Sequence, residues 1–71
     1  MEIFSQRLKY ERKQQKMSQR RIAKLLGISQ GTYAHYELLG TKNGREPPLE
    51  VIDKIATILG VTTDYLFGRE D

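Results

Sequence analysis

The chain has 71 residues and no cysteine, so we expect one domain over residues 1–71, with neither a disulfide framework nor a thiolate metal site. No apolar run approaches the roughly 18 residues of a membrane span, and the N-terminus lacks the apolar region of a signal peptide, so we expect no membrane association and a reducing cytoplasm as the location. Residues 1–46 carry ten Lys and Arg against four Asp and Glu (10 − 4 = +6), whereas residues 47–71 carry two against five (2 − 5 = −3), which is typical of a protein that binds a polyanion on one side.

A first helix is predicted over residues 3–15. Phe4, Leu8 and the stem of Arg12 recur at four-residue spacing and give this helix one buried face. A lone charge on such a face would be expensive, and Glu37 lies on the apolar side of a later helix in the same way. We therefore expect Arg12 and Glu37 to form a structural ion pair that ties the two helices together.

Two short helices are predicted over residues 18–26 and 29–38, with a tight turn between them. Ser18 and Ser29 each precede an apolar-periodic run, as N-cap residues do, and Gly27 lies where a left-handed residue ends a helix. Five apolar residues form a seam that the two helices share: Ile22, Leu26, Ile28, Tyr33 and Tyr36. Such a pair is the helix-turn-helix, whose second helix can lie in the major groove of DNA.

The basic half of the chain coincides with this helix pair. Charge alone fits an ordinary solvated surface better than a polyanion site. Arg20 and Arg21, however, lie in the first turn of the 18–26 helix, where a cation opposes the helix dipole at a cost of up to about 0.3–1 kcal/mol. A bound phosphate would remove this conflict, because backbone N–H groups, the Gln19 amide and both arginines could reach it. The alternative is that exposed arginines cost little at this position.

The outward face of the 29–38 helix carries the candidate base contacts. Its residues at the start and in the middle are small or polar: Gln30, Gly31, Thr32 and His35. The Gln30 amide can make a bidentate pair with adenine, and Thr32 can meet a thymine methyl group or a phosphate. His35 can donate to a guanine or to a backbone oxygen. The alternative is an ordinary amphipathic helix with one solvated side.

The remaining elements complete an all-helical fold. Residues 40–48, GTKNGREPP, are predicted to form a loop because they contain two Gly, one Asn and two Pro. A fourth helix is predicted over residues 49–59 and a fifth over residues 63–67. The fourth helix has a core stripe, Leu49, Ile52, Ala56 and Leu59, and beside it a second apolar stripe, Val51, Ile55 and Ile58. The sequence therefore predicts an all-α domain of five short helices packed compactly around one core.

The second stripe of the fourth helix, together with two aromatic residues near the C-terminus, is the candidate dimer surface. Its members are Val51, Ile55, Ile58, Tyr65 and Phe67. The equal alternative is that these residues add core volume beneath the fifth helix. Helix-turn-helix proteins commonly bind as two-fold dimers to half-sites about 34 Å apart, so we expect a homodimer on DNA.

The chain resembles the Cro and lambda-repressor type of helix-turn-helix proteins, the XRE family. The resemblance runs from RLKYERKQQKMSQRRIAKLLGIS through TYAHYE to PPLEVIDKIATILGVTTDYLFG. It implies a lambda-repressor-like domain in which Arg12 pairs with Glu37 and Gln19 contacts a DNA phosphate. It also implies base contacts by Gln30, Gly31, Thr32 and His35, and backbone contacts by Lys42, Asn43 and Arg45, in a loop longer than is usual for the family.

We therefore expect a transcriptional regulator, and specifically a repressor, that binds double-stranded DNA sequence-specifically. The alternative is a protein-interaction or antitoxin-type module with the same fold, and a steep loss of affinity with salt would favour DNA. An enzyme is not expected: His35 and Glu37 spell H-x-E, but the cysteine ligands of zinc deaminases are absent, and GTKNG lacks the ending of a phosphate-binding loop. No cofactor, metal or small-molecule ligand is expected.

Overall fold

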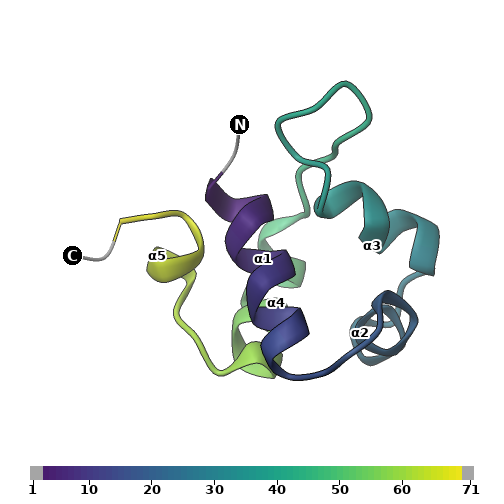
Figure 1. Cartoon of the computed structure of the whole chain (residues 1–71), viewed down its shortest axis with the longest axis horizontal. Coiled ribbons are helices and arrows are strands. Elements are labelled where there is room, and N and C mark those ends of the chain that lie inside the picture. The colour runs from purple at the N-terminus through teal and green to yellow at the C-terminus, as the bar shows by residue number, and fades with distance from the viewer. Residues whose placement is uncertain (1–2, 70–71) are drawn as a thin grey trace.

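The computed structural model describes residues 3–69, and within this range the chain forms five helices and no strand. The helices are α1 (Ile3–Gln14), α2 (Gln19–Leu26), α3 (Gln30–Tyr36), α4 (Leu49–Leu59) and α5 (Thr63–Leu66). Figure 1 shows α2 and α3 at one end of the molecule, α5 at the other end, and α1 and α4 between them. The predicted all-α architecture is confirmed. Nowhere in residues 3–69 is a helix sufficiently long and apolar to span a bilayer.

Local capping explains where α2 and α3 begin. The Ser18 hydroxyl accepts a hydrogen bond from the N–H of Arg21 at 3.0 Å. The Ser29 hydroxyl accepts one from the N–H of Thr32 at 3.1 Å. Gly27 ends α2 with a φ of 73°, a left-handed conformation that only glycine adopts without strain. Both N-caps and the glycine at the end of α2 are where the sequence predicted them.

The end of α3 differs from the prediction, because the helix ends at Tyr36 and not at Leu38. Glu37 caps the helix, and the chain then leaves the α-helical path in a tight turn. In this turn the N–H of Leu38 donates to the main-chain oxygen of His35 at 3.1 Å, which is an i to i−3 bond and not an i to i−4 bond. Residues after Tyr36 therefore begin the loop earlier than the periodicity indicated.

All five helices contribute to one hydrophobic core. Its buried members are Phe4, Leu8, Ile22, Ala23, Leu26, Tyr33, Tyr36, Ile55, Ala56, Leu59 and Leu66. The predicted core position of Leu49 is wrong, since this side chain is 73% exposed. Leu49 is the first residue of α4, and the buried side of that helix begins only at Ile52, which is 5% exposed.

Each apolar stripe of α4 is buried only in part, by packing of this helix against α2 and α5. Ile55 is 0% exposed, so its place in the predicted dimer surface is wrong and the alternative, added core volume, holds for this residue. The other four members of the predicted surface are half-buried and pack against the core: Val51, Ile58, Tyr65 and Phe67. Phe67 stacks on Phe4 of α1 with ring centroids 5.0 Å apart, which fixes the chain after α5 against α1.

Candidate nucleic-acid interface

Two main-chain hydrogen bonds fold the chain back on the end of α2 in the turn between α2 and α3. The N–H of Gly27 donates to the main-chain oxygen of Lys24 at 3.1 Å, and the N–H of Ile28 donates to that of Ala23 at 3.0 Å. Across the seam, the facing side chains are buried or half-buried: Ile22, Ala23, Leu26, Ile28, Tyr33 and Tyr36. The direction of α3 is therefore set by its packing on α2, as a helix-turn-helix requires.

The first residues of α3 face away from the core. Gln30 and Gly31 are exposed, and Thr32 and His35 are half-buried. A Cβ atom at Gly31 would meet nothing within 4 Å, so packing inside the molecule does not explain this glycine. The Ser29 hydroxyl donates to Thr32 Oγ1 at 2.8 Å, which orients both hydroxyl groups at the start of the helix. This face is open, small and polar, and its shape suits a DNA groove.

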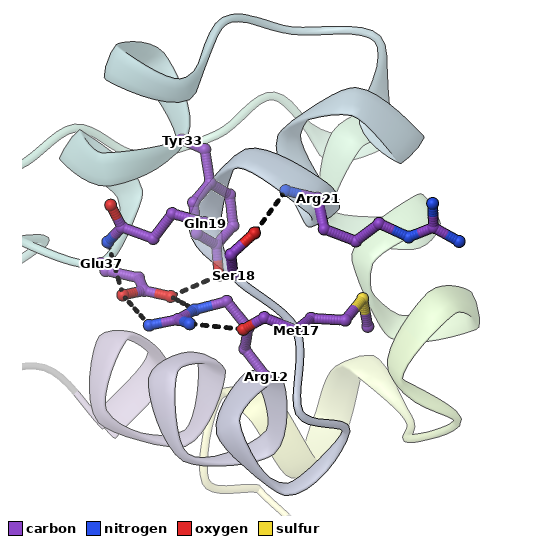
Figure 2. Close-up of polar contacts among 7 residues, drawn as sticks. All are labelled: Arg12, Met17, Ser18, Gln19, Arg21, Tyr33 and Glu37. Carbon is purple, nitrogen blue, oxygen red and sulfur yellow. Dashed lines mark hydrogen bonds and ion pairs between the residues drawn. The ribbon is translucent and has the colours of Figure 1, made fainter.

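Arg12 and Glu37 form an ion pair that connects α1 to the end of α3, as Figure 2 shows. The distance from Arg12 Nε to Glu37 Oε2 is 2.6 Å, and Arg12 Nη2 donates to Glu37 Oε1 at 3.2 Å. The two side chains are only 9% and 4% exposed. Arg12 Nη1 also donates to the main-chain oxygen of Met17 at 2.7 Å. The guanidinium group of Arg12 thus binds both the Glu37 carboxylate and the main chain of the segment that connects α1 to α2.

Glu37 accepts two further hydrogen bonds, from the Tyr33 hydroxyl at 2.5 Å and from Gln19 Nε2 at 3.0 Å. Burial raises the pKa of Glu37, but the hydrogen bonds from Arg12, Tyr33 and Gln19 outweigh it and hold this pKa below its ordinary value. The hydrogen bond to Glu37 raises the pKa of Arg12. Burial and the same carboxylate raise the pKa of Tyr33. The carboxylate therefore joins side chains from α1, α2 and α3 in its charged form.

The start of α2 carries a positive surface. Arg20 and Arg21 are exposed in its first turn, which contains no acidic residue. Among residues 3–69, neither arginine has a carboxylate within ion-pair distance. Gln19 lies next to them, with one amide hydrogen on Glu37. Because an amide group carries two hydrogens, the second is left for a phosphate oxygen. Three of the six residues predicted to contact the phosphate backbone are thus neighbours at one end of α2.

The loop after α3 projects beyond the end of that helix (Figure 1). Its predicted backbone-contact residues are all exposed: Lys42, Asn43 and Arg45. His35 Nδ1 contacts the main-chain oxygen of Asn43 at 2.7 Å, and the N–H of Arg45 donates to the main-chain oxygen of His35 at 3.0 Å. Sequence reasoning missed this contact. The pair Asn43-Gly44 indicates a turn, but no local sequence pattern predicts which part of the molecule the turn packs against.

The profile of the helix-turn-helix family matches residues 8–66. The chain belongs to the helix-turn-helix family, of the Cro and C1 type. The matched range contains the whole of α2 and α3, the Arg12–Glu37 pair and the loop after α3. The resemblance seen in the sequence is therefore confirmed.

Helix-turn-helix relatives with curated descriptions come from Bacillus subtilis (strain 168). The uncharacterized HTH-type transcriptional regulator YqaE is 41% identical over 68 residues, which are 96% of this chain and 55% of the relative. The SPbeta prophage-derived uncharacterized HTH-type transcriptional regulator YonR is 41% identical over 64 residues, 90% of this chain and 56% of the relative. The HTH-type transcriptional regulator AnsR is 41% identical over 64 residues, 90% of this chain and 52% of the relative. The chain spans about half the length of these relatives. No solved structure matches.

The helix-turn-helix family consists of regulators and not of enzymes. The positions of His35 and Glu37 in the H-x-E sequence are consistent with a regulator, because the two side chains contact different partners. His35 contacts the main chain of Asn43, and Glu37 pairs with Arg12. In the part of the chain that the structure describes, no three potential metal ligands gather in one place. Both H-x-E residues thus serve to hold the α2–α3 pair and the loop beside it.

Proposed function

We propose that this chain is the DNA-binding part of a transcriptional regulator, which places α3 in the major groove of double-stranded DNA. The observation that carries the proposal is the exposed, small and polar start of α3 on a helix-turn-helix pair. An α-helix with its side chains is roughly 10–12 Å across, so α3 can lie in a major groove about 12 Å wide. The relatives YqaE, YonR and AnsR are named as transcriptional regulators, which supports the same role.

The proposed contacts with DNA are of two chemical kinds, contacts to base edges and contacts to phosphate groups. Gln30 and Thr32 meet base edges, and Gly31 lets the backbone of α3 approach the bases closely because it has no side chain there. His35 lies one turn further along the same helix. Phosphate contacts come from two groups of residues on either side of α3: Gln19, Arg20 and Arg21 at the start of α2, and Lys42, Asn43 and Arg45 in the loop.

The finer part of the proposal is a cytoplasmic repressor that occupies its operator as a homodimer. A two-fold dimer would place two copies of α3 in half-sites about 34 Å apart on one face of the duplex. The half-buried apolar residues around α5 are the candidate dimer surface: Val51, Ile58, Tyr65 and Phe67. Ile55 is not part of it, because its side chain is inside the core.

Selection of bound duplexes from a random pool tests the proposal. We expect enrichment of one palindromic motif, whose half-site spacing reports the dimer geometry. Affinity for the selected duplex should also fall steeply with ionic strength, with a slope of log K against log salt of about −0.9 per contacted phosphate. A pool that gains no motif, or binding insensitive to salt, would contradict DNA recognition and favour the protein-interaction alternative.

A further inference from the structure

Residue 35 holds the loop after α3 at two points. Its ring contacts the main-chain oxygen of Asn43 at 2.7 Å, and its main-chain oxygen accepts a hydrogen bond from the N–H of Arg45 at 3.0 Å. Gly44, between these two anchors, has no room for a side chain, because a Cβ there would lie 2.1 Å from the main-chain oxygen of Leu38. The main chain of segment 43–45 is therefore anchored on the end of α3, while the side chains of Asn43 and Arg45 remain exposed.

Two consecutive turns bring the loop back to α3. The N–H of Thr41 donates to the main-chain oxygen of Leu38 at 2.9 Å, and the N–H of Gly44 donates to that of Thr41 at 3.1 Å. The Thr41 hydroxyl adds a bond to the Leu38 oxygen at 2.6 Å. The exposed cations Lys42 and Arg45 are thus carried on a folded segment with a defined position.

The contact to Asn43 determines which nitrogen of the His35 ring carries hydrogen. A carbonyl oxygen only accepts, so Nδ1 must be the donor. In the neutral ring, Nε2 then has no hydrogen and is an acceptor. Donation to a guanine, the role predicted from the sequence, needs a hydrogen on Nε2, which a ring with its single hydrogen on Nδ1 lacks.

His35 and Gly31 are four residues apart on α3 and share one face of the helix. The loop therefore meets the outward face of α3 at its C-terminal end. If the start of this face lies in a groove, its far end reaches the edge of that groove, where the phosphate backbone runs. The cations of the loop are then close to phosphate, and the ring of His35 joins the helix to the loop that carries them.

We propose that His35 is a positioning residue: its Nδ1–H holds the loop so that Lys42 and Arg45 bind the phosphate backbone beside α3. This inference rests on the proposed DNA binding and names the part of the site that fixes the backbone contact. His35 acts through the loop, and base reading is left to Gln30 and Thr32.

Two substitutions separate the two ring nitrogens. The amide nitrogen of His35→Asn takes about the position of Nδ1 and keeps the donor, whereas that of His35→Gln takes about the position of Nε2 and loses it. The first measurement needs no DNA: the chain has a single histidine, so its ring nitrogen shifts report directly which nitrogen is protonated. We expect a hydrogen on Nδ1, and slow exchange of the Arg45 amide that persists in His35→Asn and is lost in His35→Gln.

The second measurement is binding to the selected duplex and to unrelated duplexes. His35→Asn should bind like the wild type. His35→Gln should bind every duplex about three- to ten-fold more weakly, as expected for one lost hydrogen bond, with a salt slope reduced by about one to two because Lys42 and Arg45 are no longer held at the backbone. Lys42→Ala should weaken the wild type but have a smaller effect on His35→Gln, because both changes remove the same contact.

The reverse pattern would overturn the proposal. If His35→Gln binds like the wild type while His35→Asn changes the preferred base, then Nε2 reads a base and the loop does not depend on the ring. Failure of the wild type to bind any duplex would contradict the proposed function, and the ring shifts and exchange rates would still decide whether His35 anchors the loop.

Discussion

Gln19 Nε2 donates a hydrogen bond to Glu37 Oε1 at 3.0 Å, so the first residue of α2 is joined to the residue that caps α3 (Figure 2). The same carboxylate is paired with Arg12 of α1. The bond therefore fixes the two ends of the helix-turn-helix relative to each other. It also orients the Gln19 amide beside Arg20, where a phosphate contact is proposed. We therefore expect both the stability of the fold and the proposed DNA binding to depend on one buried carboxylate.

Replacement of Glu37 tests this dependence. Glu37→Gln should lower the free energy of unfolding by about 3 kcal/mol, because it leaves a buried guanidinium without its counter-charge. Urea unfolding measures the change. Asp64→Asn is the matched control, because it breaks an exposed ion pair. The distance from Asp64 Oδ1 to Arg69 Nη1 is 3.9 Å, and the two side chains are 63% and 69% exposed. This substitution should lower the free energy of unfolding by no more than about 0.5 kcal/mol. Equal losses in the two variants would contradict the role assigned to the buried pair.

The pH dependence of stability follows from the lowered pKa of Glu37. In the unfolded chain this carboxyl group takes up its proton near the ordinary value of about 4.3, whereas in the folded protein it stays ionised to lower pH. The unfolded state therefore binds more protons as the pH falls, and stability is lost. The advantage of the wild type over Glu37→Gln should be complete above about pH 5 and shrink as pH falls through the folded-state pKa. Urea unfolding across this range measures it, and a constant difference would be incompatible with the account.

Gln30 is expected to read a base. Gln30→Ala should relax the preference at one position of each half-site, with a loss of about 1–3 kcal/mol in discrimination, and should leave the other positions unchanged. Repeating the duplex selection with this variant measures the effect. An unchanged motif would show that the side chain does not contact a base.

Arg20 is expected to contact the backbone without regard to sequence. Arg20→Ala should weaken binding to all duplexes alike and reduce the salt slope by about one. Arg69→Ala is the control, because it removes the same charge after α5, at the end of the molecule opposite α3 (Figure 1). Titrations at several salt concentrations compare the two variants. Equal salt slopes for the two variants would mean that DNA affinity depends on net charge alone and not on the position of Arg20.

Gly31 offers a test in which stability and binding change in opposite directions. A methyl group there meets nothing within 4 Å, so Gly31→Ala should raise the free energy of unfolding by about 0.5–1 kcal/mol through helix propensity. The same methyl group should weaken binding to the selected duplex, because it fills the space between α3 and the bases. Gly44→Ala is the contrast, since its clash with Leu38 should destabilise the fold. Unchanged binding by Gly31→Ala would place the DNA elsewhere.

The sequence predicted those features that depend on local chemistry. Ser18, Ser29 and Gly27 cap or end helices through their own side chain or backbone freedom, so their roles were readable without the fold. Leu49 and Ile55 were misplaced because periodicity identifies the residues that share a helix face but not the neighbours that cover it. Which residues of the two α4 stripes are buried depends on the packing of α2 and α5 against this helix, which is a tertiary property.

The contacts of the candidate site also fall into those that local chemistry predicts and those that depend on the tertiary fold. The pairing of Arg12 with Glu37 is predictable from the sequence, because a lone charge on an apolar helix face requires a partner of opposite charge wherever the chain between them runs. The contact of His35 with Asn43 depends on how two turns of the loop fold back, which residue types alone do not specify.

Insertion of α3 into the major groove is tested by the backbone amide shifts that change when the selected duplex is added to the protein. We expect the largest changes at the start of α3, in the first turn of α2 and in the loop around Lys42, with little change in α5. Changes concentrated on α4 and α5, with α3 unaffected, would contradict insertion of α3 into the groove.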